Sequence, residues 1–172
     1  MTRPTARLVY ALRTTALRLR EGTGYKWSHF GMCNCGNLAQ TITGMDASSI
    51  HELAFKQSGD WGEQGRDYCP TSGLPMDLVV AEMLKTGLEP TDLGHIERLS
   101  HPEVMPHVPP SRRLHHASRE DTIYFMELWA DLLEARMSEA QQAELAELLT
   151  PAEPAAEPAA LADIEDDAVL AA

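Results

Sequence analysis

Apolar residues recur at every third or fourth position in several stretches of the chain, and this spacing constrains the fold more than any other feature. In segment 5–20 it places four apolar residues on one stripe: Leu8, Leu12, Ala16 and Leu19. In segment 118–137 it places five on another: Ile123, Met126, Ala130, Leu133 and Met137. A period near 3.6 is typical of amphipathic helices that bury one face.

Glycines and prolines separate these stretches, and the chain has few aromatic residues (6%) and only short β-branched runs, which argues against an all-β fold. We therefore predict a single all-α domain of five or six helices over residues 1–150. Two long loops rich in glycine and aromatic residues, 22–35 and 59–75, should interrupt it. Helix N-termini are expected at Asp46 or Ser48 and at Ser118 and Ser138, each a good N-cap residue.

Residues 151–172 differ from the rest in composition. They are dominated by alanine, proline and acidic residues, and their six acids supply half of the net charge of −12. With so little apolar mass, such a segment cannot offset the entropy lost on ordering. We predict a disordered acidic tail.

The charge balance and hydropathy limit the partners. An acidic chain lacks the basic face that broad nucleic-acid binding requires. No stretch approaches the ~20 apolar residues of a transmembrane helix, and the N-terminus has no apolar core of a secretory signal. We expect a cytoplasmic protein that does not bind membranes. The arginine-rich segment 3–20 and the acidic tail are the candidate contacts for another protein.

The strongest chemical signal is that all three cysteines fall in the two loops. An odd number of cysteines argues against a disulfide framework and favours metal binding or thiol chemistry. Zinc prefers four sulfur or imidazole ligands. Cys33, Cys35, Cys69 and His29 supply such a set, with His51 as the alternative to His29. Three glycines would let the backbone fold tightly around the ion: Gly31, Gly36 and Gly73.

A catalytic interpretation uses the same residues. Cys35 lies where a helix is expected to begin, and a helix N-terminus lowers the pKa of a nearby thiol. The segment CGNLAQ, residues 35–40, superficially resembles the nucleophile helix of papain-like hydrolases. Cys35 would then be the nucleophile of a hydrolase or acyltransferase, with His51 or His29 among several candidate bases.

The core segments CNCGNLAQ and DYCPTSGLP resemble those of a set of small uncharacterised bacterial proteins, over roughly residues 7–135. The resemblance implies a single domain. It implies no activity, because none is attached to that set of proteins. Three hypotheses follow from the sequence: a zinc-binding helical protein, which we favour, a cysteine-dependent enzyme, and an interaction module without a catalytic site.

Overall fold

The computed structural model describes residues 1–150, which contain helices and no strands, so the all-α prediction is confirmed. The predicted tail, 151–172, lies outside the described residues. Residues 1–150 contain eight α-helices and one short 3₁₀ helix in this order: α1 (Ala6–Arg20), α2 (Asn34–Thr43), α3 (Ala47–Ala54), α4 (Trp61–Arg66), α5 (Pro75–Lys85), α6 (Pro90–Arg98), η1 (Met105–His107), α7 (Arg119–Glu134) and α8 (Glu139–Leu149).

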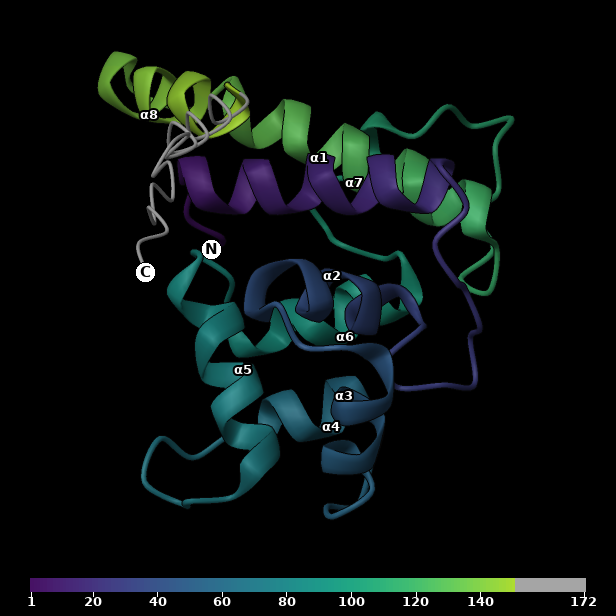
Figure 1. Cartoon of the computed structure of the whole chain (residues 1–172). Coiled ribbons are helices and arrows are strands. Elements are labelled where there is room, and N and C mark those ends of the chain that lie inside the picture. The colour runs from purple at the N-terminus through teal and green to yellow at the C-terminus, as the bar shows by residue number, and fades with distance from the viewer. Residues whose placement is uncertain (151–172) are drawn as a thin grey trace, which may run out of the picture.

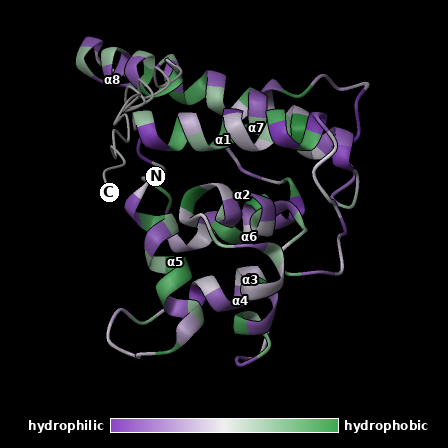
Figure 2. Ribbon diagram, viewed as in Figure 1, coloured by the Kyte–Doolittle hydropathy of each residue, from purple (hydrophilic) through white to green (hydrophobic). Residues whose placement is uncertain are grey.

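The helices form two layers (Figure 1). Helix α1 packs along α7 and contacts α8, so both ends of the described chain build one layer. Helices α2 to α6 form the other. The two apolar stripes predicted from the sequence face the core, where Leu8, Leu12, Met126 and Leu133 are fully buried, whereas Ile123 is only partly buried. Apolar residues are distributed along nearly every helix rather than confined to one (Figure 2).

The predicted helix N-termini are confirmed at Asp46, Ser118 and Ser138. Each of these side chains accepts a hydrogen bond from the backbone N–H three residues later. These bonds satisfy amide groups that have no partner within the helix itself.

The second predicted loop is partly helical. Residues 1–150 contain eight α-helices, more than the predicted five or six. Within 59–75 the chain forms α4. The Asp60 side chain caps this helix, and the Glu63 side chain accepts a hydrogen bond from the Asp60 backbone N–H. The glycines of α4 disfavour a helix locally, but they permit close packing on α6. An alanine Cβ at Gly65 would lie 2.5 Å from the Pro90 carbonyl oxygen. Tertiary packing therefore overrides the local preference.

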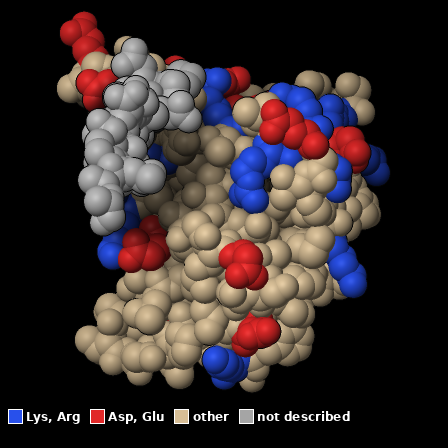
Figure 3. All heavy atoms as spheres, viewed as in Figure 1, with Lys and Arg blue, Asp and Glu red and all other residues tan. Residues whose placement is uncertain are grey.

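No helix among residues 1–150 is long and apolar enough to cross a membrane. On the face shown in Figure 3, charged side chains gather over the layer of α1 and α7, whereas the other layer presents mainly uncharged atoms.

Candidate functional site

Cys33 is the N-cap residue of α2, and its side chain is 3% exposed. Its Sγ donates a hydrogen bond to the Phe30 carbonyl oxygen (3.4 Å) and accepts one from the Gly36 N–H (3.5 Å). Burial raises the pKa of the Cys33 thiol to about 12. This thiol is therefore neutral near pH 7 and acts as a capping group.

Cys35 lies in the first turn of α2 with no exposed surface. Its Sγ donates to the Leu93 carbonyl oxygen at 3.2 Å. The sequence predicted a thiol activated by the helix N-terminus, but burial raises the pKa of Cys35 well above its ordinary value. Desolvation outweighs the helix dipole here. Cys35 thus lacks both the exposure and the thiolate character that a nucleophile needs.

Cys69 lies in the loop after α4 and is exposed. Its Sγ is 3.5 Å from the Thr71 hydroxyl, and hydrogen bonds with Thr71 lower the pKa of the thiol. Within residues 1–150, no three His, Cys, Asp or Glu side chains lie together as a metal site would require. The structure therefore does not assemble Cys33, Cys35, Cys69 and His29 into one set. Zinc binding by this set stays a prediction.

The rings of His29 and His51 stack, with centroids 3.8 Å apart and planes 14° from parallel. The His51 Nδ1 accepts the Phe30 N–H (3.1 Å), and the His29 Nδ1 accepts the Gly31 N–H (3.2 Å). An imidazole that accepts at Nδ1 carries its proton on Nε2 when neutral. The pair therefore holds the backbone of the loop before α2. In this arrangement the lone pair of the His29 Nδ1 is engaged by the Gly31 N–H, and its Nε2 carries the proton.

Acidification should weaken this fastening. Burial, together with the charges of His51 and Lys26, lowers the pKa of His29 below its ordinary value. The unfolded chain therefore takes up the proton first, and stability falls as the pH drops from about 7 towards 5. His29→Asn keeps an acceptor but cannot titrate, so its free energy of unfolding should fall less steeply than that of the wild type over this range. Urea unfolding at several pH values measures this difference, and equal slopes would contradict it.

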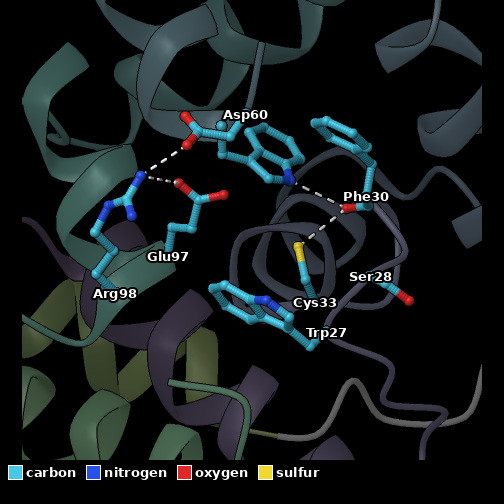
Figure 4. Close-up of a pocket in the computed structure, with 8 residues that line it drawn as sticks. Trp27, Ser28, Phe30, Cys33, Asp60, Glu97 and Arg98 are labelled. Carbon is cyan, nitrogen blue, oxygen red and sulfur yellow. Dashed lines mark hydrogen bonds and ion pairs between the residues drawn. The ribbon is translucent and has the colours of Figure 1, made fainter. Parts of the chain in front are cut away.

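A pocket of about 270 Å³ opens beside this loop, and we call it the indole pocket. Figure 4 shows its lining, in which aromatic rings face a group of charged side chains. The residues are Trp27, Ser28, Phe30, Cys33, Asp60, Trp61, Glu97 and Arg98. The Trp61 side chain is fixed because its indole N–H donates to the Phe30 carbonyl oxygen at 3.1 Å. The pocket thus joins the first loop to α4 and to the C-terminal end of α6.

Arg98 links the two acids of the pocket. Its Nη2 lies 2.7 Å from the Asp60 carboxylate and 3.8 Å from the Glu97 carboxylate. The Glu97 side chain is only 10% exposed, whereas that of Arg98 is 60% exposed. With both acids ionised, two negative charges face one positive charge, so the pocket has an excess of negative charge.

Glu97 is the unusual group in the pocket. Its Oε2 accepts the Gly62 N–H at 3.3 Å, the Trp61 backbone also interacts with the carboxylate, and no side chain among residues 1–150 donates a hydrogen bond to its Oε1. One oxygen faces Arg98, and the other points towards the space beside Trp27 and Cys33 (Figure 4). Burial raises the pKa of Glu97, and the charge of Asp60 raises it further. Such a perturbed carboxyl group in a pocket is a signature of functional sites.

The buried Asn34 side chain forms hydrogen bonds with several segments next to the pocket. Its amide Nδ2 donates to the carbonyl oxygens of Ile96 (3.2 Å) and Glu97 (3.0 Å) at the end of α6. Its Oδ1 accepts the hydroxyl groups of Tyr25 and Thr122, each at 2.7 Å. One buried side chain therefore connects the first loop, α6 and α7.

The sequence predicted both loops, 22–35 and 59–75, as the site but missed the contribution of α6 to the pocket. Nothing in the sequence singled out Glu97 or Arg98, and the sole local signal was the Asp60 and Glu63 capping pair that starts α4. With both nearby thiols neutral, the arrangement is suited to binding rather than to thiol catalysis. No protein-family model matches the chain, and no curated protein or solved structure matches it either.

Proposed function

We propose that the chain binds a small organic cation, a protonated amine on a short apolar or aromatic body, in the indole pocket. The observation that carries the proposal is the Glu97 carboxylate, which turns one oxygen into an aromatic-walled pocket where no side chain donates a hydrogen bond to it. Ligand sites commonly combine apolar walls with a few convergent polar groups.

Two interactions would favour a cation over a neutral or anionic ligand. The Glu97 carboxylate would accept a charge-assisted hydrogen bond from an ammonium group, which is stronger than a neutral one. The face of Trp27, which is half-buried, would contribute a cation–π interaction. The negative charge of Asp60 would further favour a cation in this pocket.

Cation binding should also depend on pH in a defined direction. Because the pKa of Glu97 is raised, this carboxyl group takes up a proton at a higher pH than an ordinary glutamate does. A bound cation favours the ionised form, so affinity should increase as the pH rises through the pKa of Glu97.

Titration calorimetry with phenethylamine tests the proposal. Glu97→Gln keeps the size of the side chain and an acceptor for the Gly62 N–H but removes the charge, and it should weaken binding by about tenfold or more. Glu144→Gln, an equal change of charge at an exposed position of α8, is the matched control and should bind as the wild type does. Equal affinities for the wild type and Glu97→Gln would overturn the proposal.

A further inference from the structure

A second cavity of about 260 Å³ lies beside the indole pocket, and we call it the arginine groove. It runs between α4 and α6, and its walls carry Arg66, Thr91, His95 and Arg98. Arg98 lines both cavities. The two cavities therefore share a wall and adjoin each other along the end of α6.

The groove exists because two glycines meet at its floor. A Cβ on Gly62 would lie 3.0 Å from the Gly94 Cα, and a Cβ on Gly94 would lie 3.3 Å from the Gly62 Cα. The helices therefore approach each other backbone to backbone, and both glycines line the groove. The Gly62 N–H donates to Glu97 on the side of the indole pocket, so one short helix segment serves both cavities.

The groove carries positively charged side chains with N–H groups that have no hydrogen-bond partner among residues 1–150. Among residues 1–150, Arg66 has no ion pair or hydrogen bond, and Arg98 uses only its Nη2, which leaves Nε and Nη1 free. The Thr91 hydroxyl has no hydrogen-bond partner in the same part of the chain. A planar guanidinium matches carboxylate and phosphate oxygens well.

Because the proposed function already places a cation in the adjoining pocket, we infer that the ligand is bifunctional. It carries an ammonium group for Glu97 in the indole pocket and an oxyanion, a carboxylate or a phosphate, for Arg66 and Arg98 in the arginine groove. This inference rests on the proposed function and narrows its ligand class to amino acids and aminoalkyl phosphates. The shared Arg98 lies between the two charged ends, where it also neutralises part of the acidic pair.

The experiment compares matched ligand pairs by calorimetry at low salt. Phenylalanine differs from phenethylamine by its carboxylate, and 2-aminoethyl phosphate differs from 2-aminoethanol by its phosphate. We expect at least one member with an oxyanion to bind about tenfold more tightly than its parent amine. The pair that shows the gain identifies which oxyanion the groove takes.

Arg66→Ala removes a cation from the groove without touching the lining of the indole pocket. It should abolish most of the tenfold gain and leave the affinity for the parent amine unchanged. Arg113→Ala, at an exposed position without an ion pair among residues 1–150, is the control and should retain the gain.

The two proposals fail in different ways. Amine binding that depends on Glu97, with no gain from either oxyanion or no effect of Arg66→Ala, overturns the bifunctional ligand and leaves the proposed function intact. If neither the amines nor their oxyanion partners bind, both proposals are overturned.

Discussion

Replacing Gly36 by alanine is expected to destabilise the protein by about 4 kcal/mol or more, enough to unfold many domains of this size. The added Cβ would lie 1.9 Å from the Phe30 carbonyl oxygen and 2.4 Å from the Gly31 carbonyl carbon. Both are backbone atoms, so no flexible side chain can move aside. Gly31 cannot move away, because its backbone packs directly against that of Ala47. A Cβ on Gly31 would lie 2.0 Å from the Ala47 carbonyl oxygen.

Gly44→Ala is the matched control for this prediction. Gly44 ends the same helix in the left-handed region (φ 71°) with no atom within 4 Å of an added Cβ. The cost there should be only the conformational penalty, about 1 kcal/mol. Urea unfolding followed by circular dichroism measures both changes. Similar losses for the two variants would show that the loop does not cross α2 as closely as described.

Asn34→Ala should have the second largest effect, a loss of about 3 kcal/mol in the free energy of unfolding. It would remove the amide donor of the buried Glu97 carbonyl oxygen and the shared acceptor of the Tyr25 and Thr122 hydroxyl groups, which keep carbonyl oxygens of the chain as partners. The cost of unsatisfied buried groups exceeds the net value of the bonds themselves. Because the network backs the indole pocket, amine binding should weaken in the same variant.

Asn34→Asp tests the same hydrogen-bond network through the pH dependence of stability. The new carboxylate has nearly the same shape but would face the carbonyl oxygens of Ile96 and Glu97, which now accept from the amide. Burial beside these oxygens favours the protonated acid, so the variant should be less stable at pH 7 than at pH 5 relative to the wild type. A variant whose relative stability does not change with pH would contradict the described network.

The all-helical fold was predictable because the apolar stripes of α1 and α7 are long and regular, and because serine and aspartate mark the helix starts. Helix α4 was not, since Gly62 and Gly65 lower the helix preference of so short a segment. Their value lies in the close approach to α6, which depends on residues some thirty positions later in the sequence.

The candidate site was located only in part. The sequence pointed to the loop before α2 through its cysteines, and glycines there were expected to surround an ion. In the structure Gly31 and Gly36 instead let backbone pack against backbone. Local spacing cannot show whether a thiol is buried, and it cannot show that Glu97 turns one oxygen into a pocket formed by distant segments.

The pairing of α1 with α7 and α8 has a consequence for biosynthesis. The apolar stripe of α1 emerges from the ribosome early, yet the helices that cover it follow about a hundred residues later. A nascent chain that has completed α2 to α6 would still lack α7 and α8, the helices with which α1 makes most of its contacts. We expect such chains, stalled before α7, to aggregate or to recruit chaperones, whereas the finished polypeptide does neither.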